Sequence, residues 1–242
     1  MTTALMHLLA IYAVLAAPWL GQIEFQQARK RMAAGLPDAK VRLYRSLVVE
    51  QIVSSCAVLF LWRSGRVSAT ALGLVTPRLL GWSLAALFVV VGILAWSGLR
   101  LRPKAQKIKK RLQNGVGALV PDSQQDQRWW GAVSLGAGVS EELVFRGFLL
   151  YYLSAYLPQI STPGRVFLTA LFFGLAHIYQ GWHGAVSAGI IGLVLAGIYV
   201  VTGSLLLPIV IHAATDARVL LIFPPDPRAA VAAESHASVP AS

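Results

Sequence analysis

The sequence predicts an all-helical bundle that crosses a membrane about seven times. Of the 242 residues, 56% are hydrophobic and only 13% are charged, whereas a soluble domain usually carries about a quarter charged residues. Several apolar segments reach the roughly 20 residues that a helix needs to cross the hydrocarbon core of a bilayer. No alternating pattern typical of β-strands is present, and a helix satisfies its own backbone hydrogen bonds in lipid.

The first half of the chain supplies three of the expected helices. We place them at residues 4–23, 43–62 and 79–99. The first lacks the basic region of a signal peptide, since no Lys or Arg occurs before Arg29, so we interpret it as a retained helix. Basic loops are expected at 24–42 and 100–128, and the second loop is the best internal boundary.

The second half supplies four more helices. We place them at about 129–157, at 165–180 and, as two helices, within 184–223. Trp129 and Trp130 are typical of an interfacial anchor, and the "TGS" turn with Pro208 divides the last stretch. The predicted division is therefore N-terminal membrane helices over 1–128, a core over 129–223 and a disordered tail over 224–242, which is rich in Pro, Ala and Ser.

The positive charge of the chain indicates a membrane orientation rather than nucleic-acid binding. The net charge is +11, but six of the 21 basic residues lie in 24–45 and eight in 100–128. Such clustering in loops is typical of the cytoplasmic side of a membrane protein. We therefore expect the lipid bilayer as a partner, no nucleic acid, an N-terminus outside and a cytoplasmic C-terminus. The short chain and lean loops favour a bacterial plasma membrane.

Two other features have structural interpretations. Gly184, Ala188, Gly192 and Ala196 recur every four residues, and small residues at this spacing let helix backbones approach closely in lipid. The one cysteine, Cys56, cannot form a disulfide or a cysteine-based metal site within one chain.

Several ionisable residues nevertheless lie inside the apolar segments. A charged side chain at the bilayer centre costs about 2.5–3.5 kcal/mol on insertion scales, and it usually faces the bundle interior and marks function. The residues concerned are Glu50, Glu141, Glu142, Arg146, His177, His212 and Asp216.

The fourth predicted helix carries two adjacent glutamates in unequal surroundings. Glu142 and Arg146 are four residues apart, share a helix face and can pair. Glu141 lies about 100° round the helix from Glu142, so Arg146 compensates it poorly. A carboxylate desolvated in this way is suited to act as a general base. Small residues before it leave room for water or another backbone: Gly136, Gly138 and Ser140.

Two further helices present polar groups at the same spacing. Phe173 and His177 are four residues apart in "FFGLAHIYQG", as are His212 and Asp216 in "IHAATD". Two imidazoles and a carboxylate can activate water and stabilise an oxyanion. They can equally ligate a metal that keeps one position open.

Each group also has a structural interpretation when taken alone. A membrane histidine often makes only an interhelical hydrogen bond, and a Glu–Arg pair often serves as a lock. Their joint occurrence on three apolar helices favours a functional site. Glu50 either pairs with Arg146 or faces a water-filled cavity, and we assign it a supporting role. His183, beside Trp182, is interpreted as interfacial.

Three motifs resemble those of a known family. "EELVFR" at 141–146 fits EExxxR, "FGLAH" at 173–177 fits FxxxH, and "HAATD" at 212–216 fits HxxxN or HxxxD. In this order they resemble the CAAX protease and bacteriocin-processing family, which includes type II CAAX prenyl endopeptidases and bacterial Abi-domain proteins. The resemblance covers roughly residues 130–220, and the first 128 residues match only as a hydrophobic helical lead-in.

The resemblance implies an intramembrane endopeptidase, and we expect a peptide or a membrane protein as its substrate. His177 lies near the cytoplasmic end of its predicted helix, so we expect cleavage near the cytoplasmic side. It implies that Glu141 activates water with help from His177, and that His212 and Asp216 stabilise the oxyanion. The supporting residues that it implies are Glu142, Arg146 and Phe173.

The family is usually described as a glutamate type without metal, so no cofactor is expected. The alternative is zinc or another divalent metal at Glu141, His177 and His212, although the HExxH zinc motif is absent. Asp216 departs from the more suitable Asn, because an ionised carboxylate would repel an oxyanion. It is therefore protonated, orients His212 or binds a metal.

Two other classes of function remain as alternatives. The ridge of small residues between 184 and 196 also suits a non-catalytic immunity or scaffold protein that acts through helix contacts. A transporter is less favoured, because the sequence has no internal repeat of the kind that transporters often show. The sequence does not fix an oligomeric state.

Overall fold

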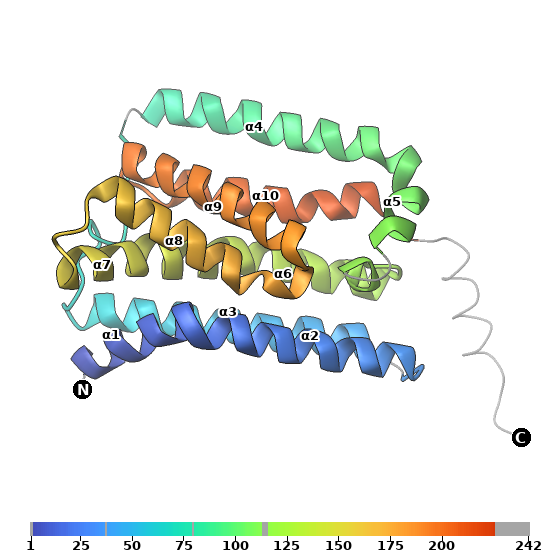
Figure 1. The fold of residues 1–242 in the computed structure, drawn as a ribbon. Helices are drawn as coiled ribbons and strands as arrows, with labels where there is room; N and C mark the ends of the chain where they lie inside the picture. The colour runs from blue at the N-terminus through green and yellow to red at the C-terminus, as the bar shows by residue number, and fades with distance from the viewer. Residues whose placement is uncertain (1, 37, 79, 113–115, 226–242) are drawn as a thin grey trace, which may run out of the picture.

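The helices of the computed structural model lie side by side along one common axis (Figure 1). The structure describes residues 2–36, 38–78, 80–112 and 116–225, and no strand occurs within these ranges. The α-helices are α1 (Thr2–Ile11), α2 (Ala17–Ala33), α3 (Ala39–Arg63), α4 (Leu80–Leu101), α5 (Ala105–Leu112), α6 (Gln124–Glu141), α7 (Leu150–Tyr156), α8 (Thr162–Ala176), α9 (Trp182–Thr202) and α10 (Leu206–Ile222).

Two rods of the bundle contain a π-helical segment. The first rod joins α1, η1 (Tyr12–Ala16) and α2, and the fourth rod joins α6, η4 (Glu142–Leu149) and α7. With α3, α4, α8, α9 and α10 they make seven rods in the described part of the chain. The remaining short segments are the 3₁₀ turns η2 (Arg102–Lys104), η3 (Val116–Leu119) and η5 (Ile178–Gln180).

The surface of the bundle is suited to lipid rather than to water. Four helices of the described chain are long and apolar enough to span a membrane: Thr3–Ala33, Ala39–Arg63, Leu80–Arg111 and Trp182–Thr202. Large apolar side chains of α4 point outward, with Trp82 79% exposed and Phe88 83% exposed, and contiguous exposure of this kind marks an interaction surface. The predicted helical membrane bundle is confirmed.

Several predicted boundaries are wrong. The first rod continues through "ARKR" to Ala33 instead of ending at residue 23, because no breaker occurs before Gly35, which has the positive φ of a helix C-terminus. The fourth rod begins at Gln124 instead of Trp129, because Ser123 and Asp126 form a reciprocal capping box. The predicted tail at 224–242 lies almost entirely outside the described residues.

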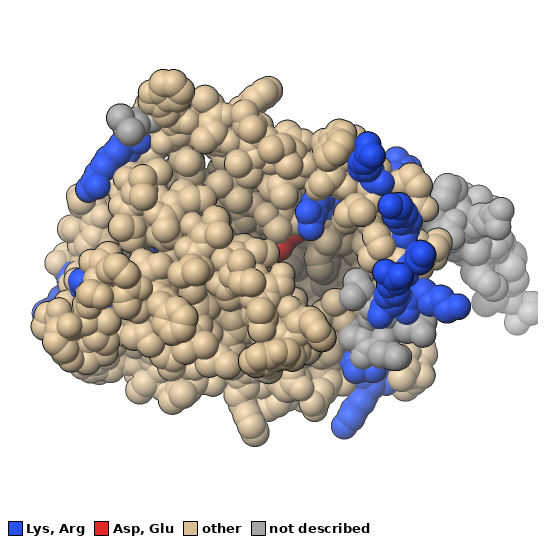
Figure 2. Space-filling view, turned by 45° about the horizontal axis from the view of Figure 1, so that its top comes forward, with Lys and Arg blue, Asp and Glu red and all other residues tan. Residues whose placement is uncertain are grey.

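The predicted loop at 100–128 is partly ordered. It contains the basic helix α5, and Lys40 and Lys109 both donate hydrogen bonds to Asp122 just before α6. This clamp ties α3 and α5 to the start of the fourth rod. In Figure 2 most Lys and Arg side chains of the visible face gather at this end of the molecule.

The π-helical segment in the first rod has a local cause. Pro18 has no backbone N–H and cannot bond to the carbonyl group of Val14, so regular α-helical bonding is interrupted there. The segment η1 contacts η4 of the fourth rod. π-helical segments are rare and occur frequently at functional sites, and here two of them meet.

Small residues hold the helices around the site in close contact. A Cβ atom on Gly138 of α6 would lie 2.8 Å from the carbonyl oxygen of Ile209 and 2.8 Å from the Cβ of Ala213, both on α10. In the predicted small-residue ridge, Ala188, Gly192 and Ala196 are buried, so this stripe of α9 faces the bundle interior. The position of α10 relative to α6 thus depends on Gly138.

We expect Gly138→Ala to lower the free energy of unfolding by about 1–3 kcal/mol, because the new methyl group meets backbone atoms that cannot move aside cheaply. Gly131→Ala is the matched control on the same helix, since its Cβ would lie 3.9 Å from the Leu220 side chain. Denaturant unfolding of the purified protein in detergent micelles measures both. Equal stability of the two variants would contradict the close packing of α6 on α10.

Candidate active site

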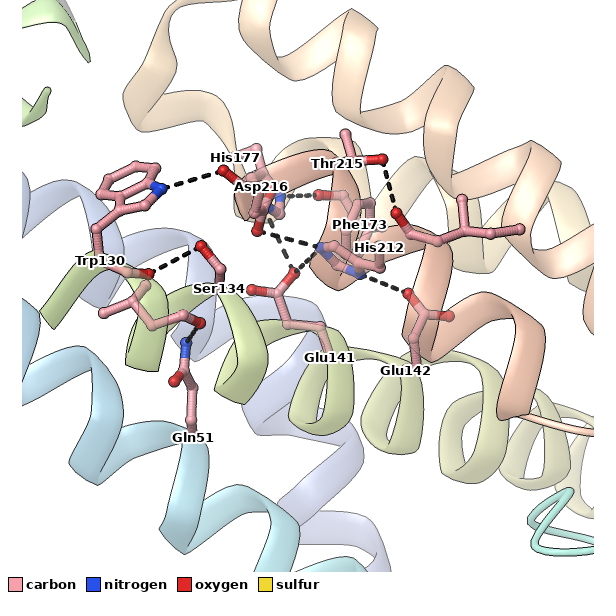
Figure 3. Close-up of polar contacts among 12 residues, drawn as sticks. Gln51, Trp130, Ser134, Glu141, Glu142, Phe173, His177, His212, Thr215 and Asp216 are labelled. Carbon is pink, nitrogen blue, oxygen red and sulfur yellow. Dashed lines mark hydrogen bonds and ion pairs between the residues drawn. The ribbon is translucent and has the colours of Figure 1, made fainter. Parts of the chain in front are cut away.

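Four ionisable side chains from three rods converge inside the bundle (Figure 3). Glu141 ends α6, His177 follows α8, and His212 and Asp216 lie one turn apart on α10. The Oε2 atom of Glu141 lies 3.7 Å from Nε2 of His177 and 3.8 Å from Nε2 of His212. Oδ2 of Asp216 lies 3.7 Å from Nε2 of His212. The structure therefore brings together all four residues that the sequence singled out as catalytic candidates.

The spacing of these groups suits a small molecule between them. Distances of 3.7–3.8 Å exceed the usual length of a direct hydrogen bond, and polar groups at such separations are commonly bridged by water. The Oε2 atom of Glu141 is buried and accepts no hydrogen bond from any described residue. It is thus a free acceptor aimed between two imidazoles.

The hydrogen-bond partners of the two histidines orient both rings in the same way. Nδ1 of His177 donates to the backbone carbonyl of Phe173 at 2.8 Å, since a carbonyl can only accept. Nδ1 of His212 donates to Oε1 of Glu142 at 2.7 Å. Both rings therefore turn Nε2 toward Glu141, and the partner on Nδ1 sets which nitrogen is available for chemistry.

The predicted Glu142–Arg146 pair is confirmed and lies at the back of the site. Both side chains are fully buried, and Nη1 of Arg146 donates to Oε1 of Glu142 at 2.8 Å. Nη2 donates to the carbonyl of Gly192 on the small-residue stripe of α9 at 3.1 Å. The guanidinium group also lies 4.3 Å from the centre of the Phe173 ring. Arg146 thus joins the fourth rod to α8 and α9.

Phe173 is the apolar wall of the site. Its ring centre lies 4.6 Å from that of His177 and 5.8 Å from that of His212. Phe145 meets it edge-on at 5.2 Å. The ring therefore fixes the spacing between the two imidazoles, as well as covering Arg146.

The site is partly exposed and adjoins a cavity. Asp216 retains 37% and Glu141 27% of its side-chain exposure, and Figure 2 shows an acidic side chain at the bottom of a hollow between the helices. A separate cavity of about 100 Å³ lies beside Glu141, between the first rod, α3 and the fourth rod. This volume holds several water molecules.

Glu50 lines this cavity, which decides between the two predicted positions for it. It does not pair with Arg146, whose donors go to Glu142 and Gly192. Instead the hydroxyl of Tyr12 donates to Oε1 of Glu50. Tyr12 was missed in the sequence, because a tyrosine in an apolar helix has no motif and its partner lies on another helix.

The described residues offer no ready metal site. No group of three or more His, Cys, Asp and Glu side chains among them is arranged to hold a metal ion. The two histidines and Glu141 come nearest, because their facing atoms stand 3.7–3.8 Å apart and point into one shared space.

Fold and site together place four ionisable side chains inside a helical membrane bundle. Residues 125–218 match a family model described as type II CAAX prenyl endopeptidase Rce1-like. The matched segment contains all three motifs and confirms the resemblance that they carry. This family implies a protease. No curated protein and no solved structure matches the chain.

We expect Arg146→Met to lower the free energy of unfolding by about 3–5 kcal/mol, because Glu142 would be left as a buried charge without its cation. Adding Glu142→Gln should restore much of this loss, since a neutral amide needs no counter-charge. Denaturant unfolding in detergent measures the full double-mutant cycle.

Arg165→Met is the control for this cycle. Arg165 bonds within α8 to the side chain of Thr162 at 3.2 Å in an exposed position, so its replacement should change stability by less than about 0.5 kcal/mol. A double variant as unstable as Arg146→Met alone would show that the pair is not the source of the loss.

Proposed function

We propose that the protein is an intramembrane endopeptidase in which Glu141 activates water for attack on a peptide bond. The observation that carries the proposal is the convergence of a free carboxylate oxygen with Nε2 of both His177 and His212, at 3.7 and 3.8 Å. A carboxylate and an imidazole that face one space can hold a water from two sides. General base catalysis by a positioned side chain requires this reach, directly or through one water.

In the first step, water is held between Glu141 and His177 and loses a proton to the Glu141 carboxylate. The water oxygen bonds to the carbonyl carbon of the substrate, and the carbonyl π electrons move to its oxygen. The tetrahedral intermediate then collapses, the C–N bond breaks, and Glu141 returns the proton to the leaving nitrogen. The products are a carboxylic acid terminus and an amine terminus, which become carboxylate and ammonium when the acid's proton passes to the amine, so atoms and charge balance.

His212 is placed to stabilise the oxyanion of this intermediate. Its Nε2 donates only when the ring carries both protons, and the Glu142 carboxylate at 2.7 Å from Nδ1 is the counter-ion of that form. Asp216 lies 3.7 Å from the same Nε2, and we assign it to orienting the His212 ring. Preorganised donors of this kind commonly supply the largest part of the rate enhancement.

We expect Glu141→Gln to reduce cleavage by about 10²–10⁴-fold, because an amide cannot take the proton from water. The measurement is a survey of new protein termini in membranes from cells that make either form at matched levels. His183→Gln is the control, since His183 is exposed at the start of α9 and outside the site. New termini should appear with the wild type and the control only.

Identical sets of protein termini with the wild type and with Glu141→Gln would contradict the proposal and favour the immunity or scaffold alternative. The metal-dependent alternative is separated by metal analysis of the purified active protein. A stoichiometric divalent metal whose removal by a chelator abolishes cleavage would establish a metalloprotease. Activity without such a metal supports the glutamate mechanism.

We further propose that the basic end of the bundle is cytoplasmic, with the N-terminus outside. The support is the concentration of Lys and Arg around α5 and the connection from α2 to α3 (Figure 2), since basic loops stay on the cytoplasmic side. The α8–α9 turn after His177 then lies on the cytoplasmic side of the site. This sidedness suits substrates presented from the cytoplasm.

We expect a fluorescent protein fused to the C-terminus to be active, because it folds in the cytoplasm. Alkaline phosphatase fused there should be inactive, because it requires export. The N-terminus should show the opposite behaviour. A C-terminal phosphatase fusion that is active would overturn this orientation without affecting the chemistry proposed for Glu141.

A further inference from the structure

The cavity beside Glu141 contains a second carboxylate that the reaction above does not use. Glu50 comes from α3 with three other lining residues, and the rest come from the first rod, the fourth rod and the segment around His177. None of the lining residues is Lys or Arg, whereas two are carboxylic acids. The wall of this cavity therefore carries negative charge whenever either acid is ionised.

Glu50 lacks the basic partner that Glu142 and Asp122 possess. Glu142 has Arg146 and His212, and Asp122 at the basic end has two lysines. Among the described residues, no Lys, Arg or His lies within ion-pair distance of Glu50, and its one hydrogen bond comes from the Tyr12 hydroxyl. A carboxylate at bilayer depth without a counter-charge is costly and usually marks function.

The surroundings of Glu50 leave acceptors unused in the cavity wall. Tyr12 occupies Oε1 of Glu50, while Oε2 receives no hydrogen bond from any described residue. Gln51, in the same wall, has a buried Oε1 atom without a hydrogen-bond partner. Buried acceptors are normally satisfied, so this wall is suited to a ligand that brings several N–H donors.

We propose that Glu50 is a specificity-determining residue that binds the ammonium or guanidinium group of a basic side chain in the peptide substrate. This inference rests on the endopeptidase function proposed for the site. A space of about 100 Å³ accepts the end of one long side chain, and Lys and Arg bring the charge and the N–H donors that the wall lacks. Because Glu50 and Glu141 line one cavity, a side chain held at Glu50 positions the neighbouring peptide bond at Glu141.

The test measures binding without turnover, in purified Glu141→Gln protein in detergent micelles. The probes are acetyl-Leu-Lys-Leu-amide and its neutral counterpart acetyl-Leu-norleucine-Leu-amide, titrated by calorimetry. We expect the lysine peptide to bind about tenfold more tightly, equivalent to ~1.4 kcal/mol. Adding Glu50→Gln should remove the preference by weakening the lysine peptide alone.

Glu24→Gln is the matched control, because Glu24 lines a different cavity together with Arg31 and Arg42. The preference should survive this change. Glu50→Asp should also keep it, since the charge remains. If Glu50→Gln fails to fold, as judged by size-exclusion elution, Tyr12→Phe replaces it and should reduce the preference by releasing the Glu50 side chain.

Equal affinity for the two peptides, or a preference that survives Glu50→Gln, would overturn the inference. These outcomes are distinct from failure of the proposed function. A lysine preference in a protein whose wild type produces no new termini would keep the cation site and remove the protease. Cleavage without any preference for basic residues would keep the protease and remove the cation site.

Discussion

The structure depends on one buried ion pair, between Glu142 and Arg146. Arg146 cannot move without breaking contacts to Glu142, to the backbone of Gly192 and to the Phe173 ring. Glu142 in turn holds Nδ1 of His212. One guanidinium group therefore sets the relative positions of the fourth rod, α8, α9 and α10. Removing either charge alone would strand the other in a low-dielectric interior, so the two must stay paired.

The donors of Arg146 go to Glu142 and Gly192, which leaves the neighbouring Glu141 without a cationic partner on its own helix. Glu141 differs from Glu142 by one position, yet it meets only weakly held partners at 3.7–3.8 Å. The adjacent acids thus differ in their surroundings: Glu142 is paired with a cation, whereas Glu141 keeps the free oxygen that the proposed mechanism uses as a base. Their separation round the helix is what permits this division, since both cannot face the same cation.

Spacing along the chain was enough to predict this part of the site. The pairs Glu142 with Arg146 and His212 with Asp216 are four residues apart, which places each pair on one helix face whatever the surrounding fold. The ends of the helices were harder to predict. The charge of "ARKR" is typical of a loop, although no residue within it stops a helix. The contact between Tyr12 and Glu50 was beyond prediction, since it depends on how two rods pack and on a π-helical segment near Pro18.

The wall of the cavity beside Glu141 combines residues of the first rod and α3 with residues of the fourth rod and of the segment around His177. Tyr12 and Glu50 lie outside the segment 125–218 that matches the family model, while Glu141, His177, His212 and Asp216 lie within it. Substitutions in the first two rods can therefore change which side chains fit in the cavity while leaving the groups of the proposed reaction in place. Proteins that share the three motifs can therefore share one chemistry and still differ in the substrates they prefer. A search for the motifs alone does not detect that difference.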